Sequence, residues 1–176
     1  MRKLYIISIF LSVFGLQNLF SQELVIGITP YQLITAGNHF DSGSGGTAFE
    51  IAYRHNFKPK FKWYAGLEAG TALWGTQLLV DAGFVYFQPI SGVWSWEATA
   101  GLQQGVALFK PTSLYTGGLT STIGIQAKLS EKSTLAFNTG LRYIFCPGYA
   151  QYSSVAGSLQ IPLNLSYRIA LYLNSK

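Results

Sequence analysis

The sequence predicts an all-β protein, an eight-stranded antiparallel up-and-down transmembrane β-barrel, and three observations lead to this fold class. Large apolar side chains alternate with small or polar ones along successive segments, as in strands with two different faces. Charged residues make up only 11% of the 176 residues, well below the roughly 25% of ordinary soluble domains. After the N-terminal leader, no apolar run reaches the roughly 18 residues of a membrane helix. A membrane location would therefore require strands.

The N-terminus predicts a secretory signal peptide. It has a basic start and then an apolar stretch over residues 4–16, and cleavage is expected after Ser21. We therefore assign residues 1–21 to the signal peptide and residues 22–176 to the outer-membrane barrel. Cys146, the single cysteine, lies far from the cleavage site, which excludes both a lipid-anchored N-terminus and an internal disulfide.

Eight alternating segments follow in order, most of them near the ~9–11 residues that a tilted strand needs to cross a bilayer. Tight turns are predicted at Pro59, at "PISG" (89–92) and at "SEKS" (130–133), with longer connections between most other segments, including the region around Lys110–Thr116. Such alternation is typical of short periplasmic turns and longer outer loops, and an even strand count places both termini in the periplasm. The predicted strands are 24–36, 47–57, 61–73, 77–88, 93–105, 117–129, 134–145 and 158–173.

The eight segments differ in how clearly their apolar and polar residues separate onto two faces. The alternation is weakest in the first segment, because Pro30 interrupts its phase. In "TAFEIAYRHNF" (47–57) large and small or polar residues alternate so regularly that the two faces are assigned without any choice of phase. In the later segments large apolar residues oppose polar ones, as Trp63 opposes Lys62, and the last segment is the cleanest. Pro30 and Pro162 lie on the first and last strands, which must pair to close a barrel. Since proline lacks the donor for a ladder hydrogen bond, we expect a bulge or a missing bond at each.

Charges and glycines decide which face points inward. No charged residue falls on a bulky face, and six strand glycines share the polar face. Hydrocarbon penalises a charge, whereas a narrow eight-stranded lumen has room only for limited side-chain volume. The polar faces should therefore line the lumen and the bulky faces should meet lipid. The fold-level alternative, a soluble β-sandwich or lipocalin-like barrel, would require the opposite orientation.

Aromatic residues should form two girdles at the lipid–water boundaries. One lies near the short turns, and Tyr143 and Phe145, with Tyr31, mark the other end. The members predicted near the short turns are Phe57, Phe61, Trp63, Tyr86, Trp94 and Tyr167.

Taken together, this pattern resembles the small outer-membrane barrels of the OmpA/OmpX type, and the leader ending "LFSQ" is similar to those of Bacteroidota secreted proteins. The chain departs from such families in ending "RIALYLNSK" rather than on a terminal aromatic residue. The resemblance implies residence in the outer membrane of a Gram-negative bacterium, contact with its lipid and lipopolysaccharide, and insertion by the barrel-assembly machinery. It implies no single activity.

The polar faces carry acids and bases at related depths, which predicts an ion-pair network that plugs the lumen. Glu50, Glu68, Asp81 and Arg142 should form one layer, and Arg54, Glu97 and Arg168 another nearer the periplasm. A proton or ion path is the functional alternative for the same residues. A general diffusion porin is not expected, because eight strands leave little free space.

The leading function is a non-enzymatic barrel, either structural or a subunit that contacts other outer-membrane proteins. A hydrolase at the outer rim is the alternative, suggested by His39, Asp41, Ser42 and Ser44 and by similar barrels that deacylate lipid A with a Ser/His/acid set. Those barrels should carry His-x-Ser on a strand, and neither His39 nor His55 is followed by that pattern. No metal site, cofactor or nucleic-acid interaction is expected.

Overall fold

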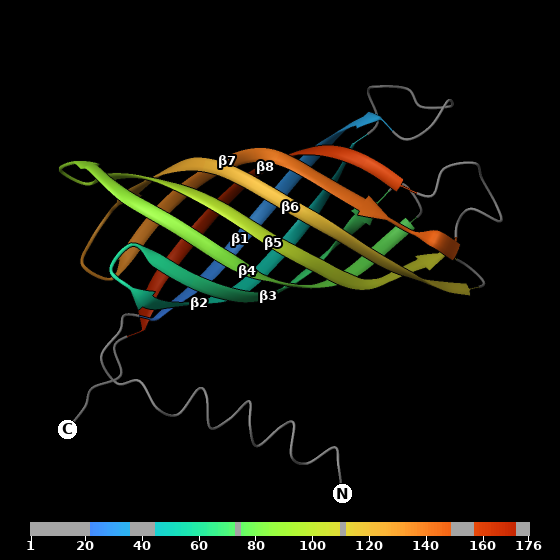
Figure 1. Ribbon diagram of the computed structural model, residues 1–176, viewed down its shortest axis with the longest axis horizontal. Helices are drawn as coiled ribbons and strands as arrows, with labels where there is room; N and C mark the ends of the chain where they lie inside the picture. Colours follow the sequence, from blue (N-terminus) through green and yellow to red (C-terminus); the bar gives the residue numbers. More distant parts are fainter. Residues whose placement is uncertain (1–21, 36–44, 73–74, 110–111, 149–156, 172–176) are drawn as a thin grey trace, which may run out of the picture.

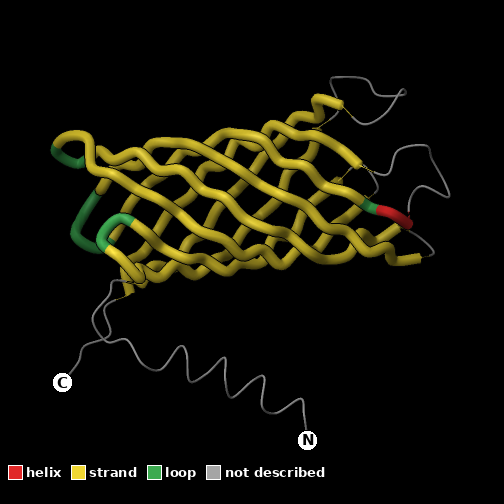
Figure 2. The backbone as a smooth tube through the Cα atoms, in the orientation of Figure 1, coloured by secondary structure: helices red, strands yellow, loops and turns green. Residues whose placement is uncertain are grey.

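The computed structural model describes residues 22–35, 45–72, 75–109, 112–148 and 157–171, and these form a closed barrel (Figures 1 and 2). Every strand pairs antiparallel with its neighbours in the chain, and β1 pairs with β8. The predicted fold class is confirmed. The strands are β1 (Gln22–Thr35), β2 (Gly45–Lys58), β3 (Phe61–Ala72), β4 (Gly75–Ser91), β5 (Trp94–Phe109), β6 (Thr112–Lys128), β7 (Ser133–Phe145) and β8 (Gly157–Leu171).

Several strands extend beyond their predicted ends. The longer connection expected around Lys110–Thr116 was wrong, because β5 runs to Phe109 and β6 begins at Thr112. Its Thr and Tyr residues favour strands, and they continue the ladder, with Thr116 opposite Gly105. The predicted turn at 89–92 is also shorter: β4 continues to Ser91, and the chain reverses at Gly92, whose φ of +55° suits glycine.

The two barrel-closing prolines interrupt the ladders without shifting the register. Between β1 and β8 the pairing passes from Ile28 opposite Leu165 to Tyr31 opposite Pro162, and the two positions between them are unpaired. Between β7 and β8 the two positions of β7 next to Pro162 are likewise unpaired. The register shift in the β1–β8 ladder lies further along, between Leu33 and Thr35. The ladders are therefore broken beside the prolines, as a missing donor requires.

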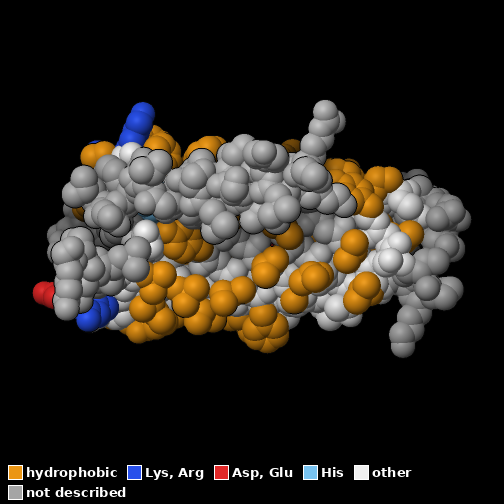
Figure 3. All heavy atoms as spheres, turned by 90° about the horizontal axis from the view of Figure 1, so that it is seen from below, with side chains coloured by type: hydrophobic (Ala, Val, Ile, Leu, Met, Phe, Trp, Pro, Cys, Tyr) orange, Lys and Arg blue, Asp and Glu red, His pale blue; other side chains and the backbone are white. Residues whose placement is uncertain are grey.

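The outer wall of the barrel is apolar. Residues such as Phe49, Leu67 and Leu102 are 66%, 49% and 60% exposed. Charged residues on the opposite face of the same strands, such as Arg54, Glu68 and Glu97, are buried. On the face seen in Figure 3, hydrophobic side chains cover the described wall and charged side chains appear at one end. Among the described residues, no helix is long and apolar enough to cross a membrane.

The phase of β1 corrects one expectation. Tyr31, predicted for the outer aromatic girdle, is only 4% exposed and points into the lumen. The β1–β2 register is continuous through Pro30, so the strand keeps its alternation across the proline. Residues with odd numbers, including Val25 and Thr29, therefore face inward along the described part of β1.

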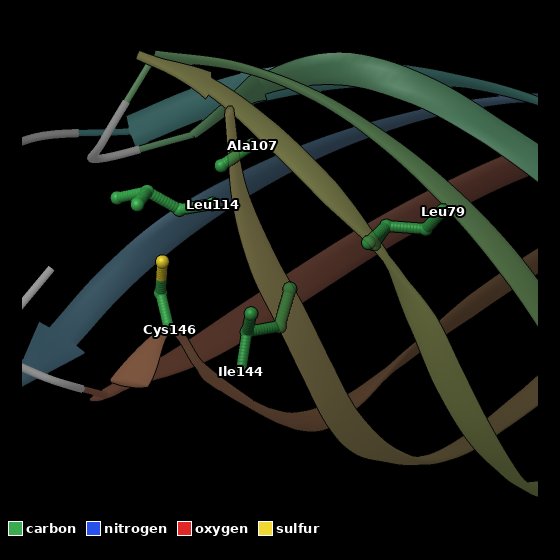
Figure 4. Packing of buried hydrophobic residues seen from close by; sticks show 5 residues of the cluster. All are labelled: Leu79, Ala107, Leu114, Ile144 and Cys146. Carbon is green, nitrogen blue, oxygen red and sulfur yellow. The ribbon is translucent and has the colours of Figure 1, made fainter. Parts of the chain in front are cut away.

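An apolar cluster fills one end of the lumen. It consists of Leu79, Ala107, Leu114, Ile144 and Cys146, contributed by β4, β5, β6, and the end of β7 (Figure 4). Cys146, the single cysteine, is fully buried here. Near the ends of β5 and β7 the inner wall therefore combines this apolar cluster with buried polar side chains, such as Gln77 opposite Ala107 and Ser158 opposite Ile144. We call these five residues the apolar collar.

Candidate functional site

The polar part of the lumen is built from residues that alternate inward on all eight strands and meet across the barrel. Strand pairing determines these contacts: Glu97 on β5 lies opposite Gly124 on β6, which lies opposite Asn138 on β7. Because Gly124 has no side chain, Asn138 reaches over it, and its Nδ2 donates to Glu97 Oε1 at 2.9 Å. Pairing of consecutive strands thus brings together residues 41 positions apart in the chain.

Glu97 is the centre of the first cluster. Arg168 donates from Nη2 to Oε1 at 2.5 Å and from Nη1 to Oε2 at 2.7 Å, a two-pronged pairing. Arg54 Nη1 lies 3.2 Å from Oε2. Glu97 and Arg168 are each 1% exposed. One carboxylate therefore balances two guanidinium groups, and this cluster carries a net positive charge.

A second ion pair lies toward the β2–β3 turn. Lys62 Nζ lies 2.5 Å from Glu23 Oε1 and 4.6 Å from the centre of the Phe87 ring. These residues line a vestibule of about 280 Å³ at the end of the barrel formed by the short turns. The predicted network did not include Glu23 or Lys62. Lys62 lies on the polar face of its segment, and the β1–β2 register places Glu23 opposite the inward-facing Arg54.

The third cluster lies closer to the apolar collar. Arg142 forms an ion pair with Glu68 and donates from Nε to Gln103 Oε1 at 2.9 Å. Its guanidinium also lies 5.8 Å from the centre of the Tyr31 ring. Glu68 and Arg142 are 4% and 2% exposed. This cluster joins β1, β3, β5 and β7 across the interior.

A cavity of about 60 Å³ lies between these clusters. Glu50 and Asp81 line it together with the hydroxyl groups of four threonines. Glu50 Oε2 accepts from Asn164 Nδ2 at 3.1 Å. Neither Glu50 nor Asp81 makes an ion pair within the described part of the chain. The threonines are Thr29, Thr99, Thr120 and Thr122.

Tyr64 forms part of the cavity wall because two glycines leave room for its ring. Tyr64 on β3 lies opposite Gly83 on β4, and Gly83 lies opposite Gly101 on β5. A Cβ at Gly83 would lie 2.8 Å from the ring, and one at Gly101 would overlap the hydroxyl group. Gly83 and Gly101, two of the glycines predicted to face the narrow lumen, therefore leave the space that the Tyr64 ring occupies.

The structure therefore divides the seven residues of the predicted network. It brings Arg54, Glu97 and Arg168 together in one cluster, and it pairs Glu68 with Arg142 in another. Glu50 and Asp81 stand apart from these pairs, at the cavity. Sequence spacing indicated the depth of each residue, whereas the choice of partner depends on which side of the barrel each strand occupies.

Apart from Tyr31, the aromatic residues predicted as girdles lie on the outer wall. Phe61 contacts Phe57 and Tyr86 with ring centres 6.2 and 5.1 Å apart, and Tyr86 contacts Trp96 at 5.3 Å. Trp96, which the prediction omitted, thus extends this row. The remaining members are exposed or half-buried outward residues, namely Trp63, Trp94, Tyr143, Phe145 and Tyr167.

Residues considered for catalysis are placed differently. His39, Asp41, Ser42 and Ser44 lie outside the described residues. His55 packs between aromatic rings, 5.7 Å from Trp63. Among the described residues, no group of three or more His, Cys, Asp or Glu side chains is arranged to hold a metal ion.

Comparison with known proteins yields matches to structures alone, since no family model and no curated protein matches the chain. Neisserial surface protein A aligns with a TM-score of 0.60 at 10% identity, over 85% of this chain and 96% of that one. The attachment invasion locus protein Ail of Yersinia pestis aligns at 0.53 and 14%, over 86% and 98%. The N-terminal barrel domain of Pseudomonas aeruginosa OprF aligns at 0.53 and 8%, over 85% and 97%. The chain has the fold of the small outer-membrane β-barrels.

Proposed function

We propose that this protein is a non-enzymatic integral barrel of the Gram-negative outer membrane, with a closed lumen, acting as a structural barrel or as a subunit of a larger envelope assembly. Its apolar outer wall would contact lipid, lipopolysaccharide or a neighbouring outer-membrane protein. Both termini would lie in the periplasm, and the barrel-assembly machinery would insert it.

The observation that carries this proposal is the occupied lumen. Ion pairs centred on Glu97 and Glu68 cross the interior between strands on different sides of the barrel. Beyond them, the apolar collar and buried polar side chains such as Gln77 and Gln160 line the lumen. A continuous water column would have to displace buried guanidinium groups from their carboxylates and then wet the apolar collar, and both steps are costly. A plugged barrel is therefore favoured over a channel.

The outer wall supports the membrane location. Large apolar side chains that are half or more exposed, such as Phe84 at 62% and Ile123 at 58%, would be unfavourable in water and favourable in hydrocarbon. A closed sheet pairs its backbone groups internally and leaves no open edge, as a lipid environment requires. The aromatic row from Phe57 to Trp96 fits the boundary between lipid and water.

Location and activity are tested by expressing the full chain in a Gram-negative host. We expect the barrel in the outer-membrane fraction of a density gradient, and lipid A of unchanged mass. A mass change that depends on the barrel would refute the non-enzymatic assignment. Recovery as a detergent-free soluble monomer would refute the membrane assignment.

Closure is tested by reconstitution into planar bilayers. Wild type should conduct at background, and Arg142→Ala should raise the conductance if the ion pairs contribute to the plug. Steady conductance by wild type would refute the closed lumen. Blue-native gels in mild detergent separate the two roles, because a stable stoichiometric complex supports the subunit role and a lone barrel supports the structural one.

A further inference from the structure

The ionised groups that face the lumen do not balance. Among the described residues, five carboxylates face four cations, which leaves one excess negative charge. Lys128, Glu131 and Lys132 lie at the exposed rim, where water screens them. The inward carboxylates are Glu23, Glu50, Glu68, Asp81 and Glu97, and the inward cations are Arg54, Lys62, Arg142 and Arg168.

The excess charge is concentrated on three neighbouring strands. Glu50 on β2 lies directly opposite Glu68 on β3, an arrangement that is destabilising for like charges. Asp81 on β4 lies opposite Gly66, two residues before Glu68 on β3. Because Gly66 has no Cβ, the Asp81 carboxylate occupies that space, with Oδ1 2.6 Å from the position of the missing atom. Three carboxylates therefore converge on one side of the cavity.

Asp81 is built into this wall without an ion-pair partner among the described residues. Its side chain is 5% exposed and lines the cavity, and its buried Oδ1 has no hydrogen-bond partner among the described residues. An uncompensated carboxylate in such a place is costly unless something positive or hydrogen-bonding meets it. The cavity of about 60 Å³ has room for a few water-sized groups.

Other charged groups around the cavity are already engaged. Arg142 on β7 pairs with Glu68 of β3, and Arg54 on β2 pairs with Glu97 outside the cavity. Tyr64 on β3 and Gln103 on β5 are uncharged groups on the same wall. Arg142 Nη1 and Arg54 Nε are buried donors without a hydrogen-bond partner among the described residues, and a water in the cavity could link Arg142 Nη1 to Asp81. Such a link adds a hydrogen bond and leaves the net charge unchanged.

We propose that the mid-lumen cavity binds one positive charge, an alkali cation or a proton, at Asp81 and Glu50. For an alkali ion, the carboxylates, the threonine hydroxyl groups and the amide oxygens provide the oxygen ligands that hard cations prefer. For a proton, one of the two carboxyl groups becomes neutral and donates a hydrogen bond. Binding of either the alkali cation or the proton neutralises the excess negative charge. This inference does not depend on the cellular role proposed above.

The test measures unfolding of the refolded barrel in a zwitterionic detergent, with urea as denaturant and tryptophan fluorescence as the signal. One series raises the pH from mildly acidic to alkaline. The other replaces N-methylglucamine chloride with sodium or potassium chloride at constant ionic strength and alkaline pH. Wild type is compared with Asp81→Asn and Glu50→Gln, which remove one lumen charge, and with Glu131→Gln, which removes the same charge from an exposed turn.

A proton at this site contributes stability at low pH that is lost as the proton is released. The folding constant of wild type should then fall by up to about tenfold per pH unit over that range, and Asp81→Asn should remove the dependence. An alkali ion would instead raise the urea midpoint of wild type at alkaline pH, with no effect on Asp81→Asn. In either case Asp81→Asn should be more stable than wild type at alkaline pH in N-methylglucamine chloride, where neither a proton nor an alkali cation neutralises Asp81. Glu131→Gln should show the same pH and salt dependence as wild type. Identical responses of wild type, Asp81→Asn and Glu50→Gln to both series would overturn the proposal.

Discussion

Replacing Glu97 with glutamine tests whether the lumen is held together by its ion pairs. Glu97 accepts from Arg54, Arg168 and Asn138. Glutamine has nearly the same shape but carries no charge, so Glu97→Gln leaves two buried guanidinium groups with no carboxylate between them. It also presents an amide donor to side chains that are themselves donors.

The expected loss of stability follows from burial. Arg54 and Arg168 are 5% and 1% exposed, so water cannot readily replace the lost carboxylate. Removing one partner of a buried ion pair typically costs about 3–5 kcal/mol. With a slope of roughly 2 kcal/mol per molar urea for a small protein, the unfolding midpoint of Glu97→Gln should fall by about 2 M.

The assay is reversible urea unfolding in detergent micelles, with Glu131→Gln as the control for loss of one exposed charge. The double variant Glu97→Gln/Arg168→Gln adds a stricter test, because it also removes one of the stranded cations. It should recover part of the lost stability, and the coupling in this double-mutant cycle should exceed about 1 kcal/mol. If Glu97→Gln unfolds within about 0.5 kcal/mol of wild type, the ordinary range for surface substitutions, then the cluster does not hold the lumen together.

Three further predictions follow from packing and exposure. Gly101→Val should lower stability by about 1–3 kcal/mol through overpacking against Tyr64. In a Tyr64→Ala background the same substitution should cost much less stability in urea unfolding; an equal loss in both backgrounds would mean that the ring is not the obstacle. Leu102→Arg, in the middle of the apolar wall, should lower the free energy of unfolding in lipid vesicles by about 2–4 kcal/mol. Leu171→Arg, at a strand end, should lower it by only about 0–1 kcal/mol. Equal effects would contradict a membrane-facing wall. Cys146, which is fully buried in the apolar collar, should react with a charged maleimide far more slowly in the folded barrel than in urea, as followed by mass spectrometry; equal rates would show that the collar is open.

Local alternation along the chain was enough to predict the fold class. In "TAFEIAYRHNF" every second residue is large, so the two faces of β2 could be separated without a structure, and the same period gave the strand count. Depth along a strand was also readable, because each residue adds a nearly constant rise. Arg54, Glu97 and Arg168 were therefore assigned to one layer before their contacts were known.

Strand ends and the phase of β1 were harder to predict. Proline and polar residues at 89–92 and 110–116 suggested turns and loops, yet cross-strand pairing extends the sheet through most of both regions. Tyr31 was assigned to the wrong face because Pro30 suggested a phase break. Pairing with β2 holds the backbone in register through Pro30, and this pairing is invisible in the sequence of β1 alone.

The sequence by itself determined that this chain forms eight two-faced strands with its charges on the inner face, because side-chain alternation is a local property of extended backbone. Closure decided what those charges do. Only the three-dimensional arrangement places Arg142 beside Glu68, 74 residues away, and gathers five apolar residues into a collar inside the lumen. It also leaves Asp81 Oδ1, beside Gly66, without a hydrogen-bond partner in the described part of the chain. These contacts depend on which side chains reach one another across the barrel. The spacing of residues along the chain does not give the distance between two such side chains.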